Sequence, residues 1–172
     1  SQQRAAEDEY IGMLESLENQ LGSTRYALRD RPSAIDAILL GGLRAHTLAD
    51  PVPDLSRFEQ ILAWEKSCDE GWDGNGDWAP FPESTPFANH MLSIAETEYK
   101  PFVLGNARAL LNKKKIFDIT TYGQRTTYLT REYPERSREM LKRFSYDVLN
   151  NSEVAVVDAW LAKTNLTELF TS

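Results

Sequence analysis

The sequence contains little of what most catalytic and metal-binding sites are built from. Among its 172 residues there is one cysteine, Cys68, and there are two histidines, His46 and His90. A single cysteine excludes a disulfide framework within the chain, and this inventory argues against zinc, which prefers several cysteine or histidine ligands at short spacing. No apolar run approaches the roughly 20 residues of a membrane span, and no signal peptide opens the chain. The sequence therefore predicts a cytoplasmic protein without a membrane partner.

The common catalytic motifs are also missing. There is no P-loop, no Gly-x-Ser-x-Gly elbow, no His-Glu-x-x-His, no Cys-x-x-Cys and no dinucleotide fingerprint. Cys68 with a histidine partner stays open as a dyad, although a free cysteine on a partly buried helix end is the simpler interpretation. Residues 73–77 resemble the start of a calcium loop, but Trp78 and Ser84 stand where such a loop needs Gly and Glu. We assign no catalytic, cofactor-binding or metal-ligating residue.

Negative charge predominates, but it is unevenly distributed. The chain has 26 Asp or Glu and 19 Lys or Arg, a formal net charge of −7. Because nucleic-acid-binding proteins usually present a basic face, we expect no nucleic-acid partner. Residues 108–143 nevertheless hold ten Lys or Arg and only four Asp or Glu. This stretch is either a solvated basic face or a surface that meets an anionic partner.

The length of the chain and the lack of any linker predict a single domain over residues 1–172. The first residue is Ser1 rather than Met, so we expect the chain to be processed, tagged or excised from something longer.

Apolar residues recur at helical spacing through most of the chain and predict an all-α fold. The predicted helices cover residues 5–21, 33–49, 55–62, 87–98, 102–113, 134–148 and 152–161. We expect the apolar side chains of residues 134–148 to lie inside, and a kink or break near Lys100 because Pro101 follows it. Residues 69–86 form a loop rich in Gly and Pro, whose two tryptophans are expected to fold back onto the core. Residues 115–131 are either a hairpin around Tyr122-Gly123 or an irregular segment.

The clearest local signal is a capping box at Ser33 and Asp36. Ser33 can accept the backbone N–H of Asp36, and the Asp36 carboxylate can accept the N–H of Ser33, which fixes the start of a helix. The helix that follows has the longest uncharged run in the chain, so we expect it at the centre of the bundle. The pair Gly41-Gly42 within it suggests that another helix backbone approaches closely.

Residues 26–39 carry a resemblance to a known family. Their sequence, Tyr-Ala-Leu-Arg-Asp-Arg-Pro-Ser-Ala-Ile-Asp-Ala-Ile-Leu, resembles a passage of the C-terminal helical domain of glutathione transferases, in which a Ser-x-x-Asp capping box opens a buried central helix. Arg29 stands where that family usually has glycine. Residues 43–46, residues 50–53, Trp64 and residues 99–110 are similar to later segments of one bacterial-type branch. Together the resemblance spans about residues 7–170.

This resemblance implies an all-α, glutathione transferase C-terminal-domain-like bundle with a central capped helix. In that family the helical domain forms the pocket for the electrophile and docks on a thioredoxin-like N-terminal domain, which binds glutathione and activates its thiol. Nothing in this sequence corresponds to that domain. The resemblance therefore implies an inactive helical half, with Ser33 and Asp36 in a folding role and glutathione as cofactor only where the missing domain is present.

The implied partners are a thioredoxin-like N-terminal domain, a hydrophobic electrophile and a second copy in a homodimer. The alternative is a non-catalytic helical interaction or scaffold module, since such domains also serve in translation and assembly complexes.

Overall fold

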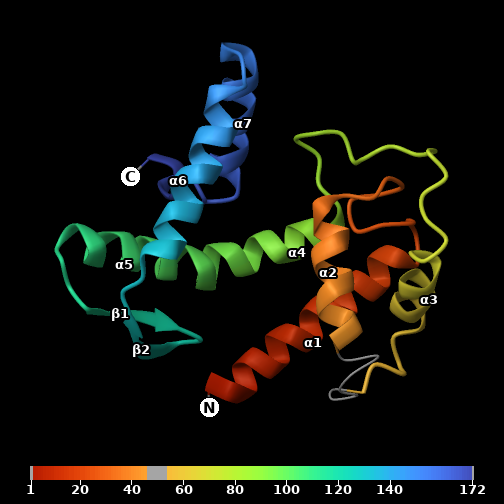
Figure 1. Ribbon diagram of the computed structural model, residues 1–172, viewed down its shortest axis with the longest axis horizontal. Coiled ribbons are helices and arrows are strands. Elements are labelled where there is room, and N and C mark those ends of the chain that lie inside the picture. Colours follow the sequence, from red (N-terminus) through yellow and green to blue (C-terminus); the bar gives the residue numbers. More distant parts are fainter. Residues whose placement is uncertain (1, 46–53, 172) are drawn as a thin grey trace. The chain divides into compact units, whose positions relative to one another are not determined.

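The structure is a computed structural model that describes residues 2–45 and 54–171. Its contacts divide the chain into two compact units, which we describe separately: the N-terminal unit, Ala6–Met91, and the C-terminal unit, Leu92–Ser172 together with Ser1–Ala5. The single domain predicted over residues 1–172 stays a prediction. The chain is mostly helical, as predicted, but it also contains a small two-stranded sheet (Figure 1).

The N-terminal unit is built from helices α1 (Gln2–Leu21, which begins in the other unit), α2 (Ala34–Arg44) and α3 (Glu59–Ser67), and from the start of α4 (Pro86–Ile94). The helix predicted over residues 5–21 is confirmed, and its apolar residues Leu14, Leu17 and Leu21 are buried. They pack in one core with residues of the following loop and of the other helices, namely Tyr26, Ala27, Leu43, Leu55, Phe58, Ile61, Trp64 and Phe87.

The prediction that α2 lies at the centre of the core is wrong for the described residues. Only Asp36 and Leu43 of this helix are buried, whereas Ile38 is 75% exposed. A Cβ added at Gly41 or Gly42 would meet no atom within 4 Å, so no other backbone approaches there. The uncharged run predicted burial, but no described segment covers this side of the helix.

The loop of residues 69–85 pairs with the loop that precedes α2. The N–H of Ala79 donates to the carbonyl of Leu28 at 2.9 Å, and the N–H of Asp30 donates to that of Asp77 at 3.1 Å. The expected burial of its tryptophans is wrong, because Trp72 and Trp78 remain partly exposed and lie against the guanidinium of Arg31 instead. A cation held over the indole faces takes the place of core packing.

The C-terminal unit contains a long helical stretch that includes Pro101. Helix α4 passes directly into a π-helical turn, Ala95–Tyr99, and then into α5 (Lys100–Leu111). The π turn stands immediately before Pro101, whose missing N–H cannot join the α-helical ladder. The α-helical register is therefore broken near Lys100, as predicted, while the helix itself continues.

A β-hairpin follows α5, which decides between the two alternatives for residues 115–131. Strands β1 (Ile116–Thr121) and β2 (Gln124–Leu129) are antiparallel, with Ile116 opposite Leu129. The turn residues Tyr122 and Gly123 both have positive φ, 49° and 68°, as a two-residue type I′ turn requires. One face of the hairpin lies against α5 (Figure 1).

Three further helices complete the C-terminal unit: α6 (Glu132–Asp147), α7 (Asn151–Lys163) and the short α8 (Glu168–Thr171). Asn150 caps α7 and forms a capping box with Glu153. The core of this unit lies between α5 and the last two helices, and its buried members are Val103, Leu104, Leu161, Leu166 and Leu169.

Candidate functional site

The capping box predicted at Ser33 and Asp36 is present. The Asp36 carboxylate accepts the N–H of Ser33 at 2.8 Å and its hydroxyl at 2.7 Å. Its other oxygen accepts the N–H of Ala27 at 2.9 Å, although Asp36 is almost completely buried. One carboxylate thus fixes both the start of α2 and the loop that precedes it.

That loop is held from a second side. The hydroxyl of Thr85, at the start of α4, donates to the carbonyl of Ala27 at 2.9 Å. Both main-chain polar groups of buried Ala27 are therefore satisfied by side chains, one of them Asp36. The first turn of α2 is rigidly oriented as a result.

The side of α2 that points away from Asp36 is exposed and carries no charge. We call this surface the α2 outer face, and its members are Ala34, Ile35, Ala37, Ile38, Gly41, Gly42 and Ala45. A solvent-facing helix surface is normally polar, because only the core-facing stripe gains by being apolar. A contiguous apolar surface of this kind is typical of a site that contacts another protein.

Helix α6 also exposes apolar side chains to solvent, and it does so more strongly than α2. The sequence predicted its apolar residues to lie inside, but Met140, Leu141, Phe144 and Val148 are all exposed, Phe144 by 72%. Together with Tyr133 they form what we call the α6 stripe. That prediction is wrong because the inward side of α6 is occupied by a polar cluster.

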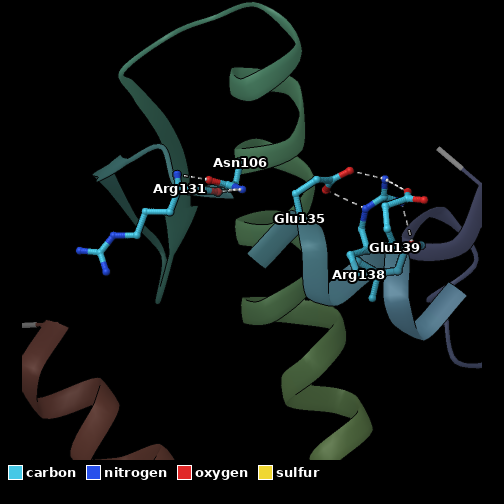
Figure 2. Close-up of polar contacts among 6 residues, drawn as sticks. Asn106, Arg131, Glu135, Arg138 and Glu139 are labelled. Carbon is cyan, nitrogen blue, oxygen red and sulfur yellow. Dashed lines mark hydrogen bonds and ion pairs between the residues drawn. The ribbon is translucent and has the colours of Figure 1, made fainter. Parts of the chain in front are cut away.

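The polar cluster is centred on Arg138, which is 6% exposed (Figure 2). Its guanidinium donates to Glu135 at 2.7 and 2.9 Å, to Glu139 at 2.8 Å, and to the backbone carbonyl of Leu169 at 3.0 Å. These bonds tie α6 to α8 and leave no room for an apolar side chain there. The hydrogen bonds to Glu135 are the main cause of a raised pKa for Arg138, so its charge is permanent. The spacing of Glu135, three residues before Arg138, is that of a helical ion pair, and it was the sequence signal that could have indicated this contact.

The hairpin and α5 line a cavity in the C-terminal unit. It is an open groove of about 740 Å³. We call it the α5–β1 groove. It is lined by one side of α5, by Asn112 just after that helix and by residues 116–120 of β1, and its lining includes Arg108 and Lys114. Sequence reasoning missed this groove, because it left the strand undecided.

The basic stretch predicted from the charge distribution begins at this groove. Lys113, Lys114 and Lys115 are exposed, and none of them forms an ion pair with a carboxylate in the part of the chain that is described. Asp118 on β1 is already engaged by Arg125 at 2.6 Å and Thr127 at 2.5 Å. The bond from Thr127, followed by that from Arg125, lowers the pKa of Asp118.

A smaller cavity of about 380 Å³ lies in the N-terminal unit between the end of α1 and α3. Tyr26, Gln60 and Trp64 are among its lining residues, and the buried indole nitrogen of Trp64 has no hydrogen-bond partner among the described atoms. The lining mixes polar and apolar groups.

Among the residues that the structure describes, the remaining candidates of the sequence do not assemble into a site. Burial raises the pKa of Cys68, which is the opposite of what a nucleophilic thiol needs, and His46 lies outside the described residues. Asp73 forms an ion pair with Arg25 and accepts the N–H of Asn75. Over residues 2–45 and 54–171, no three histidine, cysteine or acidic side chains gather in a group that could hold a metal ion.

None of the described helices is long and apolar enough to cross a bilayer. Comparison with protein-family models, with curated proteins and with solved structures finds no match to this chain.

Proposed function

We propose that this chain is the helical docking half of a glutathione transferase-like protein, and that the α2 outer face packs against a thioredoxin-like domain. The observation that carries the proposal is the exposure of seven uncharged residues on one side of a helix whose start is rigidly capped. Burying an apolar side chain such as Ile38 contributes about 1.5–3 kcal/mol, so a partner that covers this face gains substantially.

The capping box supports the resemblance on which the identity of the partner rests. Ser33 and Asp36 occupy the positions that open the central helix in the family, and Asp36 makes the expected bond to the N–H of Ser33. In that family the corresponding helix is buried, whereas α2 is largely exposed in the described chain. A missing neighbour that covers α2 accounts for the difference.

In this proposal the reaction belongs to the partner. The thioredoxin-like domain binds glutathione and lowers the pKa of its thiol, and the helical half contributes the wall that receives a hydrophobic electrophile. The cavity beside Trp64 is the candidate site for the electrophile in the N-terminal unit. It is lined by the rings of Tyr26 and Trp64, and the indole N–H of Trp64 has no hydrogen-bond partner among the described atoms. The chain alone is then inactive and binds glutathione no better than millimolar.

A second candidate function is a non-catalytic interaction or scaffold module. The α6 stripe favours it, because this apolar surface lies in the other unit and the glutathione transferase resemblance does not account for it. The two candidates predict different docking surfaces, so they can be separated by surface variants.

The test is association with a purified thioredoxin-like domain of a bacterial glutathione transferase, measured by sedimentation. We expect a complex that Ile38→Asp abolishes and that the control Leu141→Asp, on the α6 stripe, leaves intact. Both positions are half or more exposed, so neither change should unfold the chain. A complex lost with Leu141→Asp and kept with Ile38→Asp would favour the scaffold module. Glutathione binding in the micromolar range by the chain alone would contradict the proposal.

A further inference from the structure

The α5–β1 groove differs from a simple surface hollow because a strand edge forms one of its walls. Five consecutive residues of β1, 116–120, line it. A strand that presented a face would contribute alternate residues, since successive side chains point to opposite sides of a sheet. Consecutive lining residues mean that the main chain itself borders the groove.

The register of the hairpin shows which main-chain groups border it. Thr121 pairs with Gln124 across a two-residue turn, and the carbonyl of Lys115 accepts the N–H of Thr130 at 2.9 Å. In an antiparallel ladder, alternate residues direct both of their polar groups to the partner strand. The odd-numbered residues of β1 therefore face β2, while Ile116, Asp118 and Thr120 direct their N–H and C=O groups away from it. None of these groups bonds to another described element.

The two walls are held at a fixed separation. A Cβ at Gly105 would lie 2.8 Å from Ile119 and 2.9 Å from Phe117, so the hairpin packs directly on the backbone of α5. The rings of Phe102, Phe117 and Tyr128 form a cluster with centroid distances of 5.2–5.8 Å.

A side-chain amide of α5 also holds the far end of the hairpin. Asn106, which is fully buried, accepts the N–H of Arg131 at 2.9 Å and donates to its carbonyl at 2.8 Å (Figure 2). It thereby fixes the chain just after β2. The groove is preformed, so a ligand need not order it.

The charge of the groove selects the ligand. Arg108 and Lys114 in its lining form no ion pair with a described carboxylate, and Lys113 and Lys115 add positive charge beside it. The one acidic side chain in the lining, Asp118, is already neutralised by Arg125. An occupant is therefore attracted if it is acidic.

We propose that the α5–β1 groove binds an extended acidic peptide segment, which adds to the free edge of β1 as a third strand. Main-chain hydrogen bonds to Ile116, Asp118 and Thr120 supply alignment, while Arg108 and Lys114 bind carboxylates at alternate positions. The six residues of β1 set the length of the segment at about 20 Å. This proposal concerns the C-terminal unit alone and does not depend on the docking of α2.

The probe is a synthetic hexapeptide of alternating Glu and Val, blocked at both ends and titrated into the full chain. We expect saturable binding, with the amide signals of residues 116, 118 and 120 shifted in NMR spectra. Two N-methylated versions, one methylated at the three Val and one at the three Glu, separate strand addition from simple charge attraction. In an added strand only alternate N–H groups of the peptide face β1 and donate to it. Methylation of that set should therefore lower the affinity about tenfold or more, and methylation of the other set should not. Equal affinity for both versions would overturn the proposal.

Variants of the chain provide the matched controls. Thr120→Pro removes one outward N–H from an edge, where proline is tolerated, and should weaken binding, whereas Thr120→Val keeps the N–H and should not. Arg108→Glu together with Lys114→Glu should weaken it about tenfold or more. If Thr120→Pro fails to fold, the methylated peptides still decide the question. Self-association through β1 that excludes the peptide, or an oligothymidylate that binds the groove as tightly, would overturn the proposal.

Discussion

Asp36 shows how much of the N-terminal unit depends on one side chain. Its two carboxylate oxygens hold the start of α2 and the loop that contains Ala27, in a nearly dry environment. Hydrogen bonds to a charged group are stronger than neutral ones, and a buried donor left without a partner is costly.

We therefore expect Asp36→Ala to lower the free energy of unfolding by about 3 kcal/mol, since it removes the cap and leaves the N–H of Ala27 unsatisfied. Urea denaturation measures the loss. Asp77→Ala is the control, because this exposed residue contributes only its backbone carbonyl, and its midpoint should not move. An unchanged midpoint for Asp36→Ala would contradict the role assigned to the carboxylate.

Whereas Asp36 acts through its side chain, Gly105 matters because it has none. Gly105→Ala places a methyl group within 3 Å of Ile119 and Phe117 and should push the hairpin from α5, destabilising the chain by about 1–3 kcal/mol. Gly41→Ala, on the open α2 outer face, should instead stabilise it by about 0.5–1 kcal/mol. Thermal denaturation of the two variants compares the signs, and a stabilising Gly105→Ala would show that the groove is looser than described.

At the residue scale, the sequence predicted the hydrogen bonds that join residues close to each other along the chain. The bond between Asp36 and Ser33 spans three positions, so the spacing alone was enough. The bonds of Asp36 to Ala27 and of Asn106 to Arg131 join loops to helices 9 and 25 positions apart. No local pattern reports such distances.

Among the elements, the helical hairpin of α6 and α7 carries a titratable contact. The hydroxyl of Tyr146 donates to Asp158 at 2.6 Å, and this bond raises the pKa of Tyr146 to about 12. The unfolded chain has the ordinary tyrosine pKa of about 10. A pKa that is higher in the folded state stabilises the fold below pH 10, and the stabilisation is lost as the pH rises from 10 to 12.

We expect Tyr146 to ionise near pH 12 in an ultraviolet titration, and its step to move towards pH 10 in Asp158→Ala. Tyr146→Phe, which removes the hydroxyl, should lose this step, while Tyr10 and Tyr26, whose pKa values are raised by burial, still ionise above pH 10. An unchanged number of late-ionising tyrosines in Tyr146→Phe would contradict this contact.

The helices themselves followed from apolar spacing, but the direction in which two of them face did not. In α1 the apolar residues Leu14, Leu17 and Leu21 do face the core, together with the buried Gln20. In α6 the carboxylates of Glu135 and Glu139 pair with the buried Arg138, so the inward side of the helix can be polar. The apolar stripe therefore faces outward. Periodicity locates a stripe on a helix, and only tertiary contacts decide what covers it.

At the scale of the molecule, the described residues offer three candidate surfaces for partners: the α2 outer face, the α6 stripe and the α5–β1 groove. The first two are apolar, and the third combines a strand edge with positive charge. They lie on different elements, so each can be changed without the others. Of these, the α2 outer face is the surface that we propose meets a thioredoxin-like domain.

The most direct measurement is photo-crosslinking in the source cells from a benzophenone amino acid placed at Ile38, with the adduct identified by mass spectrometry. A matched probe at Leu141, on the α6 stripe, reports the competing surface. We predict that position 38 crosslinks to a thioredoxin-like sequence, either on a separate protein or on a segment joined to this chain, and that position 141 does not. Adducts of position 38 with sequences that lack a thioredoxin-like fold, while position 141 captures one defined partner, would contradict this prediction.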